Sequence, residues 1–269
     1  MRASLLQAGR SDFHVHTASS PDAARDCTLE NVAAVAAGLG LREIGVADHV
    51  QANGEREPGQ SWQCTDLEAF AARCRRVREE PWPVRLLSGW EVDYYASGQY
   101  SFHPDEHLPL LDYVLLGHHS FGAMAAESPA RIAAYLLRIT MAMAVEPYAD
   151  IVAHPFYFVP PAARHGQVLA CLADAQLAEV FAAMREHGKA AEITAYQFSA
   201  DLRGVEQMKR VYSVARQAGV KFTLDSDAHR LWDVGDGLRC LYVLQELGFA
   251  DEDFVDYAGL RRLREGCRC

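Results

Sequence analysis

Short apolar runs alternate with longer amphipathic segments along most of the chain. Each run is bounded by polar or turn-forming residues, a pattern typical of strands that are buried on both faces of a parallel sheet. Strands are therefore expected over residues 12–16, 43–48, 84–91, 113–117, 151–154, 190–193 and 221–226.

The segments between these runs have signals for helix starts and stops. Thr28 can cap a helix over 29–38, and Thr65-x-x-Glu68 has the pattern of a capping box for a helix over 66–79. Ser128 followed by Pro129 predicts a long helix that ends at about residue 145. Further helices are expected over 174–188, 204–219, 236–247 and 251–265.

Alternating strands and helices predict an α/β fold with a parallel sheet and right-handed crossovers. Closed on itself, a sheet of these strands is a TIM-barrel-like (β/α)7 barrel, one strand short of the common type. We expect residues 1–269 to form one domain. In such barrels the chemistry lies at the carboxyl ends of the strands.

Composition narrows the class of protein. The net charge of -10 disfavours a protein that coats nucleic acid, since phosphate contacts need Lys and Arg. No apolar run approaches the roughly 18 residues that a membrane span needs, and the N-terminus lacks the apolar core of a secretory signal, so a cytoplasmic location is expected. The seven cysteines form no C-x-x-C motif and are interpreted as free thiols.

Histidines and acids gather at the expected strand ends. The clusters are His14-Val-His16, Asp48-His49, Glu91, His118-His119, His154-Pro155 and Asp227-Ala-His229. Imidazole and carboxylate ligands without cysteine suit Zn, Mn or Fe. Two such ions held close together can activate a water and neutralise the charge of a phosphoryl group.

In their order, these motifs together with Asp22 resemble the polymerase-and-histidinol-phosphatase (PHP) superfamily. The resemblance covers residues from about 12 to 230. It implies a distorted (β/α)7 barrel, a centre of two to three divalent metal ions and hydrolysis of phosphate esters. Departures include Asp22, where many members have His, and Thr194, in a segment that reads Glu-(Val/Ile)-Asn-Thr in the family.

Carried over by position, the resemblance implies three metal sites. Their ligands are His14, His16, Glu91 and Asp227 for the first; Glu91, His119 and His154 for the second; Asp22, His49 and His229 for the third. Of the pair His118-His119, we favour His119, because the Ser-Phe that follows fits the family pattern. Asp48 is interpreted as a supporting carboxylate rather than a ligand.

The leading hypothesis is a phosphatase that acts on a small-molecule phosphate monoester, with histidinol phosphate as the best-named candidate. A hydroxide that bridges two metals would attack phosphorus, and Asp227 or His229 would protonate the leaving alkoxide. Arg164 and Arg230 are candidates for gripping the phosphate, and His103 for lining the pocket.

Three alternatives remain open. A phosphodiesterase or nuclease of the same fold would need a groove with cations and stacking aromatics, which the acidic balance disfavours. A metal-binding module without catalysis would show full metal loading without turnover. An amidohydrolase-type C–N hydrolase would normally need a lysine-derived or second carboxylate bridge, and no Lys stands at an expected strand end.

Overall fold

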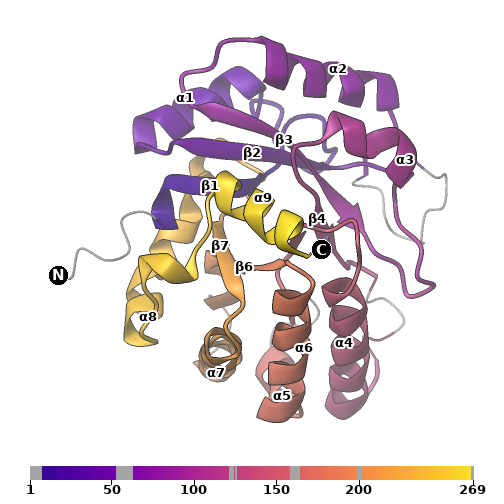
Figure 1. Cartoon of the computed structure of the whole chain (residues 1–269), viewed down its shortest axis with the longest axis vertical. Helices are drawn as coiled ribbons and strands as arrows, with labels where there is room; N and C mark the ends of the chain where they lie inside the picture. Colours follow the sequence, from indigo (N-terminus) through magenta and orange to yellow (C-terminus); the bar gives the residue numbers. More distant parts are fainter. Residues whose placement is uncertain are drawn as a thin grey trace.

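A computed structural model describes residues 8–52, 63–120, 124, 126–157, 164–198 and 202–267. Within them, parallel strands form one sheet in sequence order, β1-β2-β3-β4-β5-β6-β7. Their bounds are β1 Ser11–Val15, β2 Glu43–His49, β3 Arg85–Asp93, β4 Leu115–Gly117, β5 Ile151–Val152, β6 Ala190–Thr194 and β7 Lys221–Asp225. The sheet curves into a nearly closed barrel with helices around it, which confirms the expected fold class (Figure 1).

The described helices cover the outside and one end of this barrel (Figure 1). They are α1 Leu29–Leu39, α2 Leu67–Glu79, α3 Pro104–His107, α4 Pro129–Ala144, α5 His165–Leu169, α6 Asp174–Glu186, α7 Leu202–Ala218, α8 Leu241–Glu246 and α9 Tyr257–Gly266. None of them is long and apolar enough to cross a membrane.

The strand predictions are confirmed to within a few residues, but some helix predictions are wrong in detail. The cap of α2 is Asp66, not Thr65, because the Asp66 carboxylate accepts the Ala69 amide at 2.9 Å. Residues 236–240 form a 3-10 turn before α8, and α9 begins after Asp256 rather than at 251. The helices α3 and α5 were not predicted, since a helix of one turn has too few residues to show a period.

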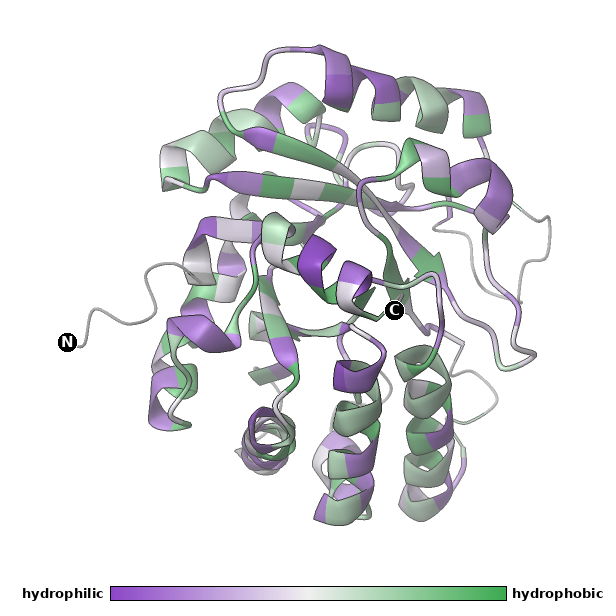
Figure 2. Cartoon of the chain, viewed as in Figure 1, coloured by the Kyte–Doolittle hydropathy of each residue, from purple (hydrophilic) through white to green (hydrophobic). Residues whose placement is uncertain are grey.

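Helix α4 illustrates why these segments pack on the sheet. Its buried residues include Ile132, Leu136, Ile139 and Met143, which recur three or four positions apart and so share one face. Figure 2 shows hydrophobic residues along the strands and on α4 and α6. Burying a large apolar side chain contributes roughly 1.5–3 kcal/mol, so such faces hold the helices to the barrel.

A cluster of buried apolar side chains fills one end of the barrel interior. Phe13, Tyr113, Leu115 and Ile151 pack there, and Tyr257 and Leu260 of α9 close it. The Tyr113 ring lies against Gly45 and Gly89, where a Cβ atom would meet the Tyr113 hydroxyl oxygen at 2.0 Å and 2.4 Å. The two glycines therefore make room for an aromatic ring inside the barrel.

The seam between β1 and β7 closes the barrel with few ladder bonds. His16 N donates to Ala228 O at 2.8 Å, and two buried carboxylates supply further links. Asp12 accepts the Ser226 amide at 3.0 Å, and Asp225 accepts the Phe13 amide at 2.6 Å. Burial raises the pKa of both carboxyl groups. Side chains thus replace backbone pairing where the ring of strands closes.

Candidate metal centre

Glu91, on β3, is the central residue of a cluster at the carboxyl ends of the strands. It is 1% exposed. Its Oε2 atom lies 3.0 Å from His14 Nε2 and 3.2 Å from His49 Nδ1. Its Oε1 atom lies 3.0 Å from His154 Nε2 and 3.3 Å from His119 Nε2. The two oxygens of one carboxylate therefore face two different sets of imidazoles.

The donor atoms form four groups, each within 4.8 Å. The groups are His14, His16, Glu91 and Asp227; Glu91, His119 and His154; His16, His49 and His229; and His49, Asp93 and His119. The first two contain the same residues as the first two sites that the resemblance implies. The third group contains His49 and His229 of the third implied site, with His16 in place of Asp22. Asp22 Oδ2 lies 3.3 Å from His229 Nε2 and 3.9 Å from His49 Nε2. The structure thus brings all nine expected ligands together.

The arrangement of these atoms fits divalent cations. Glu91 Oε2 is buried and has no aligned hydrogen-bond donor, although imidazole nitrogens surround it. The Nε2 atoms of His14 and His16 lie 3.1 Å apart, and a neutral imidazole has one nitrogen with a free lone pair. Burying so many convergent lone pairs is costly unless a cation lies between them. Nitrogen and oxygen donors without sulfur suit Zn, Mn or Fe.

Two of the cluster residues have an unusual backbone conformation. The backbone angle φ is 29° at His154 and 54° at Asp227, values that residues other than glycine rarely adopt. The His154 amide donates to Glu192 Oε2 at 2.7 Å, which holds that conformation. Strain of this kind, just past β5 and β7, is characteristic of functional sites.

Carboxylates behind the cluster orient two of its imidazoles. Glu192 Oε1 lies 2.6 Å from His14 Nδ1, and Asp93 Oδ1 lies 2.5 Å from His119 Nδ1. Sequence reasoning gave neither residue a role. Their signal was an acid within an apolar run: Glu192 interrupts β6, and Asp93 follows Glu91 by two positions on the same face of β3. Such partners fix the ring orientation of metal-binding histidines.

Asp48 lies outside the groups of donor atoms and tethers the loop after β1. Its carboxylate accepts the Thr17 amide at 2.5 Å, the Thr17 hydroxyl at 2.7 Å and the Ser20 hydroxyl at 3.1 Å. Arg73 Nε lies 3.3 Å away and balances its charge. The Ser20 hydroxyl in turn is 3.3 Å from His16 Nδ1, so Asp48 supports the loop that leads to Asp22.

The charges of the cluster shift its pKa values in opposite directions. Burial alone would lower the pKa of His14, but Glu192, Glu91 and Asp227 raise it well above its usual value. Burial lowers the pKa of His49 to about 4. For His229, burial is outweighed by the hydrogen bond to Asp22 and by Asp227, which raise its pKa to about 9. This dense mixture of charges is typical of functional sites.

The structure separates His118 from His119. His119 faces Glu91, whereas His118 Nδ1 lies 2.6 Å from Tyr94 O and its Nε2 lies 2.7 Å from the Tyr135 hydroxyl. Both ring nitrogens of His118 therefore have partners outside the cluster.

The three candidates for substrate contacts have other partners. Arg164 donates to Glu127 O, and Arg230 lies over the Trp232 ring at 5.4 Å. His103 precedes α3, is exposed, and stacks on His107 with ring centroids 6.0 Å apart.

Comparison with known proteins gives sequence relatives that are named as probable phosphatases. No family model matches the chain. A probable phosphatase of Thermoanaerobacter sp. (strain X514) is 27% identical over 94% of this chain and 92% of its own length. One from Edwardsiella ictaluri (strain 93-146) is 26% identical over 94% and 91%.

Two solved structures share the fold. A putative histidinol phosphatase from Listeria monocytogenes superposes with a TM-score of 0.65 at 15% identity, covering 86% of this chain and 99% of its own. Histidinol phosphate phosphatase from Lactococcus lactis subsp. lactis, complexed with Zn, L-histidinol and phosphate, gives 0.61 at 16% identity, with 90% and 94% covered.

Fold, motif order and relatives agree on the class. They agree with the resemblance noted in the sequence, because the sequence relatives are named as probable phosphatases and the two solved structures share the fold. The cluster is capable of binding metal.

Proposed function

We propose that this chain is a metal-dependent phosphatase that hydrolyses a small-molecule phosphate monoester. The observation that carries the proposal is the shared carboxylate of Glu91, which joins the His14/His16/Asp227 set to the His119/His154 set. A bridge of this kind suits two ions held close together. Histidinol phosphate is the best-named substrate, because a protein of the same fold was solved with L-histidinol, phosphate and Zn.

We assign the metal-holding role to His14, His16, Asp22, His49, Glu91, His119, His154, Asp227 and His229. Two to three Zn, Mn or Fe ions would supply the means to activate water and to neutralise phosphate charge. The protein's own contribution is to hold the donor atoms and keep the site compact. Glu192 and Asp93 keep the imidazoles of His14 and His119 turned toward Glu91.

Asp227 and His229 are the proposed catalytic pair. They are 16% and 30% exposed, whereas His14, His16 and Glu91 are fully buried. A substrate that approaches from solvent therefore meets this pair, and we assign to it the transfer of a proton to the leaving alkoxide. Arg230, Arg164 and His103 remain the proposed contacts for the phosphate and the pocket wall.

The test combines metal content with turnover. Protein purified without added metal or a His-tag is analysed by elemental mass spectrometry and assayed for phosphate release from histidinol phosphate and p-nitrophenyl phosphate. We expect two to three equivalents of metal and release of phosphate. His14→Ala and Asp227→Ala should lose turnover and keep the fold. His187→Ala is the matched control, because His187 is an exposed residue at the end of α6.

Other outcomes separate the alternatives. Protein that binds no metal after Mn or Zn is supplied would overturn the metal centre. Full loading without phosphate release from either ester would favour a binding module. Cleavage of single-stranded oligonucleotides in place of monoesters would favour a nuclease.

A further inference from the structure

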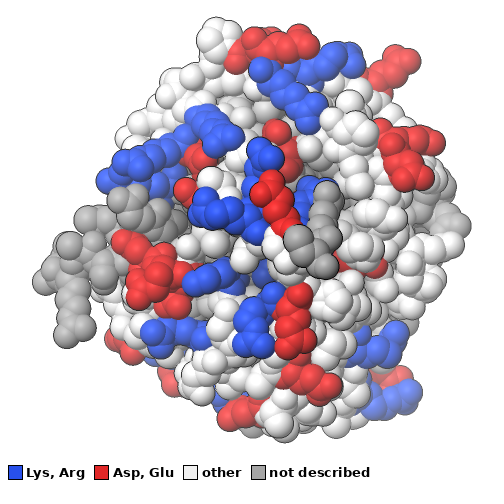
Figure 3. Space-filling model, in the orientation of Figure 1, with Lys and Arg blue, Asp and Glu red and all other residues white. Residues whose placement is uncertain are grey.

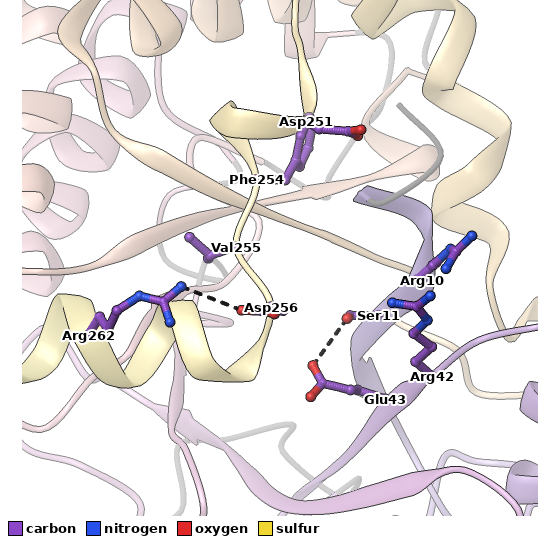
Figure 4. A pocket seen from close by; sticks show the side chains of 9 residues that line it. All are labelled: Arg10, Ser11, Arg42, Glu43, Asp251, Phe254, Val255, Asp256 and Arg262. Atoms are coloured by element: carbon purple, nitrogen blue, oxygen red, sulfur yellow. Dashed lines mark hydrogen bonds and ion pairs between the residues drawn. The ribbon is translucent and has the colours of Figure 1, made fainter. Parts of the chain in front are cut away.

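The end of the barrel opposite to the metal centre has an open cavity of about 400 Å³. Its walls include Arg10, Ser11, Arg42, Glu43, Asp256 and Arg262 (Figure 4). β1 and β2 begin here, and a strand rises about 3.3 Å per residue, so Ser11 lies roughly 15 Å from His16. A small ligand in this cavity would therefore not touch the metal cluster, and the volume is in the range of small-molecule sites.

Two arginines stand side by side at this cavity. Ser11 and Glu43 are paired in register between β1 and β2, and Arg10 and Arg42 immediately precede them. The Arg42 amide donates to Arg10 O at 2.8 Å, and Figure 4 shows the two side chains next to each other. Arg10 ends a 3-10 turn before β1 and Arg42 precedes β2, and two neighbouring positive charges repel each other. This pair therefore favours a bound anion.

The carboxylates of the wall are engaged with other groups. Glu43 Oε1 lies 3.0 Å from Arg85, and its Oε2 accepts the Tyr257 amide at 3.0 Å and the Ser11 hydroxyl at 3.3 Å. Asp256 caps α9 by accepting the Gly259 amide at 2.8 Å. Among the described residues, no carboxylate pairs with Arg10 or Arg42. Asp251 is a third carboxylate of the wall, and within the described part of the chain none of the three forms an ion pair with Arg10 or Arg42.

A third guanidinium lies across the cavity. Arg262 of α9 is 4.0 Å from Asp256, the limit of an ion pair. On the face that α9 covers, Figure 3 shows Lys and Arg side chains next to Asp and Glu side chains.

We propose that Arg10 and Arg42 form a second, non-catalytic binding site for a phosphate group, either free phosphate or the phosphate of a small molecule. Paired guanidinium groups match the geometry of phosphate oxygens and can each donate two hydrogen bonds. Arg262 would contribute charge from the opposite wall. The site is independent of the proposed phosphatase activity, since it shares no residue with the metal cluster.

Calorimetric titration with inorganic phosphate and with glycerol phosphate, at constant ionic strength, tests the proposal. The full chain, its Asp227→Ala variant and the double variant Arg10→Gln/Arg42→Gln are compared. The matched control is Arg239→Gln/Arg261→Gln, which removes the same charge from exposed arginines paired with Asp236 and Glu265. Circular dichroism checks that each variant is folded, and Arg10→Lys/Arg42→Lys keeps the charge but loses the paired geometry.

We expect binding at this cavity to weaken about tenfold or more in Arg10→Gln/Arg42→Gln, less in the lysine variant, and not at all in the control, whereas Asp227→Ala should lose only the binding at the metal centre. Tighter binding of glycerol phosphate than of phosphate would identify a phosphorylated small molecule as the ligand. Equal weakening in the control would indicate a general charge effect and overturn the site. So would absence of binding, or binding lost only in Asp227→Ala.

Discussion

At the scale of single residues, the site depends on carboxylates that contact the imidazole rings from two sides. Glu91 faces the cluster from its centre, and Glu192 and Asp93 hold rings from behind. Glu192 has two tasks, since one oxygen faces His14 Nδ1 and the other accepts the His154 amide. One side chain thus couples a ligand of the first set to a ligand of the second.

Replacing Glu192 by Gln should weaken metal binding about 10- to 100-fold while the fold is retained. The amide keeps one acceptor oxygen, so it can serve His14 or His154 but not both. Metal affinity is measured by competition with a chelator. Glu186→Gln, on the surface of α6, is the matched control and should bind metal like the wild type. Unchanged affinity in Glu192→Gln would mean that these contacts do not position the ligands.

Tyr113 provides a pH-dependent test away from the metal ligands. Its hydroxyl donates to Phe13 O at 2.5 Å inside the barrel. Burial, followed by nearby Asp225, raises the pKa of Tyr113 well above its usual value. A folded-state pKa above the unfolded value of about 10 stabilises the protein fully below pH 10, and this stabilisation is lost as the pH rises further.

Tyr113→Phe should therefore lower the free energy of unfolding by about 1–2 kcal/mol at pH 7, because Phe13 O loses its donor. The difference from the wild type should shrink above pH 10, since phenylalanine does not ionise. Urea unfolding at several pH values measures it. Tyr242→Phe, at an exposed position, should show no difference at any pH. A Tyr113→Phe deficit that stays constant to pH 11 would contradict the assignment.

At the scale of elements, β2 and β3 each have a glycine where the aromatic ring of Tyr113 packs against them. Gly45 and Gly89 are at interior positions of these strands, and the Tyr113 ring occupies the space that side chains would need. The pairing of β2 with β3 in continuous register from Glu43 to His49 brings the two glycines close to the same ring. The same register delivers His49 and Glu91 to one level of the metal cluster.

Gly89→Ala should destabilise the protein by about 1–3 kcal/mol, because its new methyl group would lie 2.3 Å from Tyr113 Cζ. Gly38→Ala is the control: Gly38 lies in α1 with open space around it, and alanine should be neutral there or stabilise by up to about 1 kcal/mol. Denaturant unfolding gives both values. Equal stability of the two variants would show that the strands move apart at no cost.

At the scale of the whole molecule, the metal cluster and the barrel closure reinforce each other. His14 on β1, His16 directly after it, and Asp227 after β7 meet on either side of the seam where backbone pairing is sparse. A cation held by both sides would therefore tie the first strand to the last. Metal binding to the folded chain stabilises it by mass action.

Removing metal with a chelator should lower the stability by about 3–4 kcal/mol, for free metal at several hundred times its dissociation constant. Differential scanning calorimetry before chelation, after it, and after addition of Zn or Mn measures the loss and its recovery. In Asp227→Ala the chelator should have a smaller effect. A melting temperature that does not respond to chelation would contradict the tie across the seam.

The sequence by itself determined the strands and the kinds of donor atoms. Strands buried on both faces must be apolar runs, and the polar residues at their ends are visible as His and acid motifs, so β1 to β7 and the expected ligands could be located without a structure. Their grouping came from the resemblance, and only the structure shows which atoms are neighbours. The one-turn helices α3 and α5 were missed because their sequences are too short to carry a period.

Only the tertiary structure decided what depends on closure of the barrel. Three features bring together residues that are far apart in the sequence. They are the contacts of Glu192 and Asp93 with His14 and His119, the seam held by Asp12 and Asp225, and the pair Arg10 and Arg42. Periodicity is a local property of a sequence, whereas register between distant strands is fixed when the ring of strands closes and the interior packs. The chain therefore encodes which groups are available, and the closed barrel selects which of them meet.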